Sequence, residues 1–462
     1  MSVAAIILAA GKGTRMRSKR AKVLHELGGE PMIARAIAAV AALEPEPIVI
    51  VVGHQAREVE AAVGFSKARF ALQEPQRGTG DAARCGLSQV PAGFTGDVFI
   101  AYGDMPAIAP ATLRAFLDAH RKRGAKLSFI SIILDDPGAY GRVIRDAGGK
   151  VEKIVEFRDA SPAERAIKEI NTGFYLVDAA ILRSALAELK PGNAQDEYYL
   201  TDIVAIARAR NAKVEAWVAA DPAQFAGINS REELANMETE IRAAVNRRLM
   251  QSGVTLVDPP TAYISEQAEI APDCVIGPNV QIIGMCKLGE GVRIDGTAWL
   301  SNVTIGPRCH LKLGVRAEDC SIGEESEIGP FANLRAGTEL AGHNRIGNFV
   351  ETKKARLGRG TKASHLSYLG DATIGADTNI GCGVITVNYD GYEKHQTVIG
   401  DRCMVGCDTQ LVAPVKVGSD VFVASGTTIV REVSDGALVL SHHPQREKAG
   451  WMAAWRKRHG HG

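Results

Sequence analysis

The second half of the chain repeats with a period of six residues. From Ile264 a large aliphatic side chain recurs at every sixth position as far as Leu300, and the pattern resumes in shifted frames up to Ile429. Glycine often follows the aliphatic residue, and a small or β-branched residue lies four places after it. A strict period of six does not fit an α-helix, whereas a parallel β-helix uses it for one short strand and one turn. The repeat therefore predicts a parallel β-helix.

Interruptions of the repeat show where this scaffold can carry other structure. The frame slips around residues 313–321 and 352–356, and it breaks across 388–397. The break leaves the polar segment Asn388–Lys394 outside any coil. Because loops on rigid scaffolds are common binding sites, we expect this segment to contribute to one.

Most of the eight cysteines are explained by the same frame. No CxxC pair or regular metal-ligand spacing occurs among them, so packing is favoured over zinc binding or disulfides. Five fall where the frame takes a small inward side chain, namely Cys274, Cys286, Cys309, Cys320 and Cys403.

The first half of the chain, to about residue 229, alternates short apolar runs with helical patterns. The runs at 3–8, 48–52 and 98–102 are continuous, as in strands buried on both faces, and helical patterns lie at 31–42 and 112–123. This alternation predicts a doubly wound α/β sheet. Such sheets bind ligands beyond the carboxyl ends of their strands.

A helix start separates the two halves. Ser230 and Glu233 have the spacing of a capping box, and Gly253 can end the helix after about Gln251. We expect this helix to join two domains. The predicted parts are an α/β domain at 1–229, a linker helix at 230–252, a β-helix domain at 253–437 and a tail at 438–462.

The charge balance gives no general attraction to nucleic acid or to an anionic membrane, because 54 basic residues face 53 acidic ones. The apolar run near the start lacks a basic flank and ends at Gly11, and no later stretch approaches the length of about 18 apolar residues that spans a membrane. We expect a soluble, cytoplasmic protein with no integral membrane segment and no nucleic-acid partner.

A glycine-containing loop follows the first apolar run. Residues 8–16 read LAAGKGTRM, which lacks the third glycine of a dinucleotide fingerprint and the ending of a P-loop. Its backbone N–H groups could still hold phosphate, with charge from Lys12, Arg15 and Lys22. Taken alone, the segment could equally be a solvated surface turn.

Other polar residues follow the remaining runs. Asp104 comes just after a buried strand, where a Mg²⁺ ligand beside phosphates would lie. Gln73 and the turn 78–80 suit recognition of a base edge. Further polar groups lie near apparent strand ends at 140–142, Glu156, 171–173 and Asn229.

These residues form a series of motifs that resembles a known family. LAAGKGTRM, KVLH, QRGTGDA, YGDMP, YGR, IVE, NTG and GIN occur in the order seen in sugar-1-phosphate nucleotidyltransferases. With the hexapeptide half, residues 3–451 resemble the bifunctional N-acetylglucosamine-1-phosphate uridylyltransferase/glucosamine-1-phosphate N-acetyltransferases. The resemblance implies an α/β Rossmann-like nucleotidyltransferase domain, a linker helix and a left-handed parallel β-helix with acetyltransferase activity.

The resemblance also implies roles in the first domain. Arg15 and Lys22 would contact phosphates during an in-line attack of a sugar phosphate on the α-phosphorus of UTP, and Asp104 with Asn229 would hold Mg²⁺. The sugar would contact Gly141, Glu156, Asn171 and Asn229. UTP would contact Leu8, Ala9, Ala10, Gly11, Lys22, Gln73, Gly78, Thr79, Tyr102, Gly103 and Asp104.

The β-helix carries an unusual number of polar residues, among them a histidine. A single histidine on a coil is usually packed or solvated, but His365 accompanies groups that suit an anionic sugar phosphate, and an imidazole can take a proton at neutral pH. These groups are Arg335, Lys353, Tyr368, Asn379 and Lys394. The resemblance makes His365 the general base and Glu351 the residue that orients it, at a site between the subunits of a homotrimer.

Acetyl-CoA is implied by the resemblance as the acetyl donor. Two residues depart from the family pattern: Cys407 stands where serine is common, and His442 stands where arginine is common. The tail at 451–458 could form a short amphipathic helix that covers the β-helix end, touches the coenzyme or meets a membrane surface. The implied coenzyme contacts are Asn388, Tyr389, Cys407, Ser425, His442 and Lys448.

Two alternatives stay open at this point. The β-helix could be only an assembly or regulatory module of a nucleotidyltransferase, or the whole chain could be a scaffold without catalysis. The nucleotide is also open, because uracil and thymine differ by one methyl group, which a pocket discriminates by only about 1–3 kcal/mol.

Overall fold

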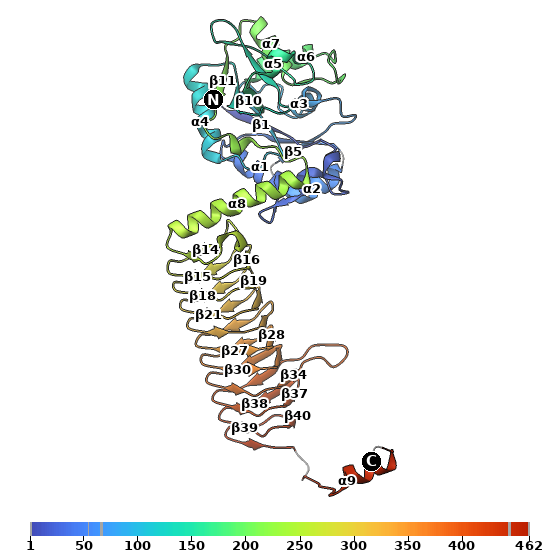
Figure 1. Cartoon of the computed structure of the whole chain (residues 1–462), viewed down its shortest axis with the longest axis vertical. Coiled ribbons are helices and arrows are strands. Elements are labelled where there is room, and N and C mark those ends of the chain that lie inside the picture. Colours follow the sequence, from blue (N-terminus) through green and yellow to red (C-terminus); the bar gives the residue numbers. More distant parts are fainter. Residues whose placement is uncertain (1, 54, 65–67, 442–444, 461–462) are drawn as a thin grey trace. The chain divides into compact units, whose positions relative to one another are not determined.

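A computed structural model describes residues 2–53, 55–64, 68–441 and 445–460 of the chain (Figure 1). The chain divides into two compact units, Met1–Glu240 and Ile241–Gly462. Within the described residues, none of the helices combines the length and the apolar character needed to cross a membrane.

The first unit is built on one mixed sheet. Its four parallel strands β5, β4, β1 and β6 have the order expected of an α/β sheet, but β10 is antiparallel to both β6 and β7. The α/β domain that the alternation predicted is confirmed. The antiparallel direction of β10 could not be predicted, because an apolar run does not encode strand direction. The order is β11 (Val214–Val218), β7 (Leu127–Ile133), β10 (Glu169–Asp178), β6 (Asp97–Tyr102), β1 (Val3–Leu8), β4 (Ile48–Val52) and β5 (Ala68–Leu72).

Helices cover both faces of this sheet and enclose two apolar clusters. One cluster contains residues of α1 and α4, and the other contains residues of α3, α6 and α7. A small ribbon of β8 (Arg142–Arg145) and β9 (Val151–Val155) joins β10. The helices are α1 (Met32–Ala41), α2 (Ala56–Val63), α3 (Thr79–Leu87), α4 (Pro110–Arg123), α5 (Pro162–Arg165), α6 (Ala179–Glu188) and α7 (Asp202–Ala209).

The helix α8 (Arg231–Gln251) contains the boundary between the two units. At its start Ser230 Oγ accepts a hydrogen bond from the Glu233 N–H (3.1 Å), as predicted. The Glu233 carboxylate accepts from the N–H of Asn229 (2.5 Å) rather than from that of Ser230, so only half of the capping box forms. Toward its other end Val245 and Leu249 belong to the core of the second unit.

The second unit is the parallel β-helix that the period of six predicted, and it is left-handed, as the resemblance implied (Figure 1). Its short strands stack into three parallel sheets: the first runs from β12 (Thr255–Leu256) to β41 (Leu438–Val439), the second from β13 (Tyr263–Ile264) to β40 (Thr428–Ile429), and the third from β14 (Glu269–Ile270) to β38 (Val415–Val417). The aliphatic residues of the repeat form one continuous core, which includes the five cysteines predicted to point inward. Parallel pairing continues through both frame slips.

The strands around the polar segment position the candidate site of this unit. In the first sheet these are β27 (Arg345–Asn348), β30 (Lys362–His365), β33 (Asn379–Ile380), β36 (Met404–Val405) and β39 (Phe422–Val423). In the second sheet they are β25 (Asn333–Leu334), β28 (Glu351–Lys353), β31 (Tyr368–Gly370), β34 (Ile385–Val387) and β37 (Gln410–Val412). In the third sheet β35 (Thr397–Ile399) receives the chain after the segment.

The tail forms the short helix α9 (Trp451–Arg458). The rings of Trp451 and Trp455 stack with centroids 6.4 Å apart, and three basic residues occupy the last turn. All eight side chains are exposed.

Candidate active sites of the two units

The loops after β1, β4 and β6 leave the sheet at one common edge. Leu8 pairs with both Val51 and Tyr102 in the sheet. The Gly103 N–H donates to Leu8 O and the Ala9 N–H donates to Val51 O, each at 2.9 Å. The predicted residues Leu8, Ala9, Tyr102 and Gly103 therefore lie together, as the position beyond neighbouring parallel strands requires.

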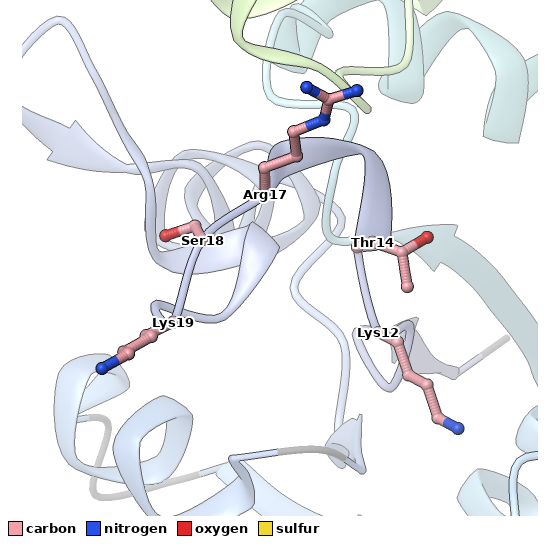
Figure 2. A pocket seen from close by; sticks show the side chains of 6 residues that line it. Lys12, Thr14, Arg17, Ser18 and Lys19 are labelled. Atoms are coloured by element: carbon pink, nitrogen blue, oxygen red, sulfur yellow. The ribbon is translucent and has the colours of Figure 1, made fainter.

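The loop after β1 surrounds a hollow of about 660 Å³. Figure 2 shows Lys12 and Lys19 leaving opposite arms of this loop, with Arg17 and Thr14 between them. The Gln76 amide donates to Ala10 O and the Gln55 amide donates to Lys19 O, so side chains from two later loops fix the backbone. The lining is Lys12, Gly13, Thr14, Arg17, Ser18 and Lys19, three of them cationic and none acidic.

This basic loop suits a polyphosphate. The predicted residues Gly11 and Arg15 lie in it and are exposed. Sequence reasoning missed Arg17 and Lys19, although the run of basic residues from 15 to 20 was a signal for them.

Lys22 joins two acidic or polar residues that are distant in sequence. Its ammonium contacts Asp104 Oδ2 and donates to Asn229 Oδ1 (3.0 Å), 82 and 207 residues later in the chain. The Lys22 and Asp104 side chains are mostly buried, with 11% and 16% exposed. The other carboxylate oxygen, Asp104 Oδ1, is buried and has no hydrogen-bond partner.

The same atoms fit a divalent metal. An orphaned carboxylate oxygen beside an amide oxygen is a hard donor set of the kind that Mg²⁺ prefers, with its other ligands coming from phosphates and water. Among the described residues no group of three or more histidine, cysteine or acidic side chains could hold a metal alone. A metal at Asp104 and Asn229 would therefore depend on a bound substrate.

A second predicted group lies around α3. The buried Gln73 amide donates to Gly78 O (3.0 Å) and to Asp81 Oδ2 (3.1 Å). Gly78 has a φ of +105°, and a Cβ at this position would lie 2.6 Å from Tyr198 O, so no other residue fits. Thr79 Oγ1 accepts from the Leu200 N–H (3.1 Å). These contacts hold the turn rigidly beside the sheet edge.

The NTG motif lies on a β-bulge of β10. The pairing with β7 shifts between Asn171 and Tyr175, and such bulges re-aim side chains. Asn171 donates to the Tyr175 hydroxyl (2.7 Å). Gly173 has a φ of +90°, and a Cβ there would lie 2.5 Å from the Tyr102 ring. The bulge thus brings the motif against the end of β6.

Gly141 and Glu156 complete this side of the site. Gly141 O accepts from the Asn171 N–H (2.9 Å), and Glu156 accepts from the Thr201 hydroxyl (3.2 Å). Burial raises the pKa of Glu156. Burial, then the charges of Glu156 and Asp104, raise the pKa of Tyr102 far above its usual range, so this phenol stays protonated between the two carboxylates.

A group of cations gathers around the second sheet of the β-helix: Lys353 ends β28, Arg335 follows β25, and Lys394 lies in the loop between β34 and β35. Arg335 donates to Glu351 Oε1 (2.7 Å), and Glu351 pairs in the sheet with Tyr368. Contact with the Lys394 ammonium, together with the charge of Arg335, lowers the pKa of Lys353. We call Arg335, Lys353 and Lys394 the cation cluster. Like charges held this close suit an anion that would neutralise them.

The segment that breaks the repeat forms a loop that projects from the β-helix after β34 (Figure 1) and carries Lys394 of this cluster. Asn388, which is 7% exposed, donates to Asp371 Oδ2 (2.5 Å) and to the Tyr368 hydroxyl (3.5 Å). Asp390 accepts from two backbone N–H groups and contacts His395 Nε2 (2.6 Å). The backbone hydrogen bonds, then His395, lower the pKa of Asp390. Tyr389 is 56% exposed and pairs with Lys394.

Four side chains form a column along the corner where the chain passes from the first sheet to the second. Constant pairing registers place His365 beside Cys382, Cys382 beside Cys407, and Cys407 beside Ser425 on successive coils. We call these four residues the corner column. Three of them, His365, Cys407 and Ser425, were predicted site residues. Cys382 was not predicted to lie here, although its frame position matches that of Cys407, and it is assigned no role in either reaction.

Some predicted residues are not brought together within one chain. Asn379 lies on the first sheet, donates to Met404 Sδ (3.3 Å), and is not on the sheet around which the cation cluster gathers. Among the described hydrogen bonds, none joins Glu351 to His365. Lys448 lies in the exposed tail, and His442 lies outside the described residues.

Each unit matches known families. Residues 5–138 match the MobA-like NTP transferase domain, residues 259–341 match the GMPPB C-terminal domain, and residues 396–431 match the bacterial transferase hexapeptide with six repeats. The fold and the sites thus define a nucleotidyltransferase domain fused to a hexapeptide transferase.

Similarity to curated relatives extends over nearly the whole chain. It is 47% identical to the bifunctional protein GlmU of Pelobacter propionicus, with 99% of both chains covered. It is 47% identical to that of Geotalea daltonii, with 97% and 98% covered, and 43% identical to that of Corynebacterium glutamicum, with 98% and 94% covered. The chain therefore belongs to the family of the bifunctional protein GlmU.

This membership establishes the class of activity. The chain is a bifunctional enzyme of cell-wall biosynthesis, with uridylyl transfer in the nucleotidyltransferase domain and acetyl transfer in the hexapeptide domain. It acts on nucleotide and sugar-phosphate substrates, forms oligomers and uses a divalent metal. The two alternatives left open by the sequence are therefore wrong: the β-helix is not only an assembly or regulatory module, and the chain is not a scaffold without catalysis.

Proposed function

We propose that the β-helix transfers the acetyl group of acetyl-CoA to glucosamine-1-phosphate, and that the first domain then transfers uridylyl from UTP to N-acetylglucosamine-1-phosphate. Pyrophosphate is released, and the product feeds peptidoglycan and lipopolysaccharide precursors. The observation that carries the proposal is the contact of Lys22 with both Asp104 and Asn229 at the carboxyl edge of the sheet. The proposed domains are 1–229 and 253–437, with a linker helix at 230–252 and a tail at 438–462. We place both reactions in the cytoplasm.

The uridylyl transfer site uses positioning and charge neutralisation. Lys22 and Arg15 bind phosphate oxygens, and the turn at Gln73, Gly78 and Thr79 holds the base and ribose with Leu8, Ala10 and Gly11. Asp104 and Asn229 would hold Mg²⁺, which would supply charge neutralisation for the phosphates. The sugar phosphate, held by Gly141, Glu156 and Asn171, attacks the α-phosphorus in line, so no protein nucleophile is needed.

The acetyl transfer site needs a base and an anion site. The cation cluster binds the phosphate of glucosamine-1-phosphate, with Tyr368 and Asn379 contributing to sugar binding. His365 accepts a proton from the amine of glucosamine-1-phosphate as the amine nitrogen attacks the thioester carbonyl. The imidazolium then returns this proton to the sulfur, so that CoA leaves as the thiol. Glu351 supports this imidazole. The coenzyme contacts Asn388, Tyr389, Cys407, Ser425, His442 and Lys448.

The assembly that we propose is a homotrimer. Asn379 lies on the first sheet and Lys353 of the cation cluster lies on the second, and a second copy would supply Asn379 to the cation cluster of its neighbour. An apolar ridge supports a second copy as the partner: Phe331, Phe349 and Leu366 lie beside the corner column and are 47%, 59% and 59% exposed. The two phenyl rings stack with centroids 5.6 Å apart.

The backbone of this ridge is strained. Phe331, Phe349 and Leu366 have φ values of 55°, 58° and 45°, in the left-handed region that costs a bulky side chain about 1 kcal/mol or more. Asparagine or glycine would relieve the strain. Burial of a phenyl group in an interface would contribute about 1.5–3 kcal/mol of stabilisation, which offsets the cost of the strained backbone. An interface therefore explains why phenylalanine occupies these exposed positions.

Replacement of Phe349 by asparagine tests this interface. Asn tolerates the left-handed conformation, so we expect the β-helix to remain folded while the trimer dissociates at micromolar concentration. Light scattering after size exclusion measures the mass, and thermal unfolding checks the fold. The control is Phe422→Asn, a similarly exposed phenylalanine (53%) with an ordinary backbone. A Phe349→Asn protein that stays trimeric would contradict the role of the ridge.

A coupled assay tests both reactions and their order. Purified protein is incubated with glucosamine-1-phosphate, acetyl-CoA, UTP and Mg²⁺, and free CoA thiol and pyrophosphate are followed separately. We expect both products, with pyrophosphate formed only when acetyl-CoA is present. Replacing UTP by dTTP measures the nucleotide preference. Pyrophosphate from supplied N-acetylglucosamine-1-phosphate without CoA release would overturn the acetyl transfer proposal.

A further inference from the structure

The two central members of the corner column are cysteines on adjacent coils. Ile380 pairs with Val405 before them and Ile385 pairs with Gln410 after them, so the register is the same on both sides. The Asp408 N–H donates to Cys382 O (2.7 Å), which fixes the two corner peptides side by side. Cys382 therefore lies directly opposite Cys407, although the interrupting loop separates them in sequence.

Their separation and exposure suit a disulfide. Neighbouring strands lie about 4.8 Å apart, and disulfides join Cα atoms about 4.4–6.8 Å apart. Cys407 is exposed and Cys382 is partly exposed, and both are free thiols. The parallel ladder fixes the backbone of both residues, so the pair is preorganised.

The other cysteines lie in different environments. Cys274, Cys286, Cys309, Cys320 and Cys403 are buried in the β-helix core. Burial raises the pKa of Cys274, Cys286 and Cys309, and raises that of Cys320 to about 12, which disfavours the reactive thiolate. Cys85 is partly exposed, as Cys382 is, but the first unit holds no second cysteine to pair with it, and burial raises its pKa. Oxidants should therefore act selectively on the corner pair.

We propose that Cys382 and Cys407 form a dithiol that hydrogen peroxide oxidises to a disulfide, and that this disulfide switches acetyl transfer off. One thiol loses its proton and attacks peroxide to give a sulfenic acid and water. The thiol of the other cysteine displaces the second water and forms the S–S bond, so two thiols and one peroxide give one disulfide and two waters. A small dithiol reverses the reaction by thiol exchange.

The expected effect on activity rests on the proposed acetyl transfer site. The pair lies between His365 and Ser425 in the corner column, along the strip assigned to the base and the coenzyme. The disulfide would draw the Cys407 sulfur toward Cys382 and remove its polar S–H from this strip. Acetyl transfer should therefore fall, while uridylyl transfer, carried by the other domain, should not.

The experiment treats the full-length protein with hydrogen peroxide and divides the sample. Peptide mapping without reduction should find the Cys382 and Cys407 peptides joined, with the loss of two hydrogens. CoA release should fall at least about tenfold and recover with dithiothreitol, while pyrophosphate formation from supplied N-acetylglucosamine-1-phosphate stays constant. Cys382→Ala, which changes a residue assigned no role in either reaction, should keep its CoA release after peroxide. Cys85→Ala should behave like the unmodified chain.

Distinct outcomes would overturn each part. The absence of a joined peptide would refute the disulfide. If Cys382→Ala loses CoA release after peroxide as much as the unmodified chain does, the disulfide is not the cause of the lost activity. Oxidation of Cys407 alone would then explain the loss. A reduced protein that releases no CoA at all would refute the proposed acetyl transfer, and peptide mapping would still decide whether the disulfide forms.

Discussion

Replacement of Asp104 by alanine should abolish uridylyl transfer, with a loss of at least about a thousandfold, and leave acetyl transfer unchanged. The variant removes the carboxylate that contacts Lys22 and whose other oxygen is buried without a partner. Without it, Lys22 keeps its hydrogen bond to Asn229, and the metal that we propose at Asp104 and Asn229 would lose its charged protein ligand. Because this catalysis depends on charge neutralisation and positioning, few other groups could compensate.

Both activities should be measured on the same sample, since retained acetyl transfer shows that the second domain is intact. Circular dichroism and thermal unfolding check the first domain. Glu152→Ala, which removes an exposed carboxylate of β9, is the matched control and should keep both activities. Raising the Mg²⁺ concentration should not rescue Asp104→Ala. Equal loss of both activities in a folded protein would refute the assignment of Asp104.

The β-helix could be predicted from the sequence because its period fixes which side chains point inward. Each aliphatic residue of the repeat occupies the same position in its coil, so Ile276, Leu334 and Val405 all reach one core. The same argument correctly placed the five inward cysteines. It could not place Cys382 opposite Cys407, because the repeat does not indicate how many residues of the interrupting loop lie outside the coils. The pairing register of the two coils therefore could not be read from the sequence.

The first domain shows a different limit. The strand ends after β1 and β6 could be predicted because continuous apolar runs stop there. The contact of Lys22 with Asn229 joins residues 207 positions apart, and no local pattern encodes it. Arg17 and Lys19 were missed because side chains in a loop without a period point in directions that only the folded backbone decides. The motif resemblance supplied what spacing could not.

The backbone strain at the corners of the β-helix also could not be predicted from the period of six. The frame indicates that a turn follows each strand, but the left-handed φ values of Phe331 and Phe349 arise only in the folded coil. Phenylalanine at such a position opposes local preference. Conflict between local preference and structure is expected where a surface has a function, so the backbone strain of these residues supports the proposed interface more strongly than their hydrophobicity does.

Replacement of His365 by asparagine should lower acetyl transfer about a hundredfold to ten-thousandfold, the range that a positioned general base contributes. His365 is exposed at the end of β30, three residues before Tyr368, so its imidazole can be exchanged with little effect on the core.

Steady-state kinetics of acetyl transfer distinguish a base from a binding residue. In the His365→Asn variant, kcat should fall with little change in the KM of glucosamine-1-phosphate, because the cation cluster still binds the phosphate. Uridylyl transfer should be unaffected. His310→Asn, on the same sheet, should keep full activity. A raised KM with unchanged kcat would make His365 a binding residue and leave the base to be sought among the loop residues around Asn388.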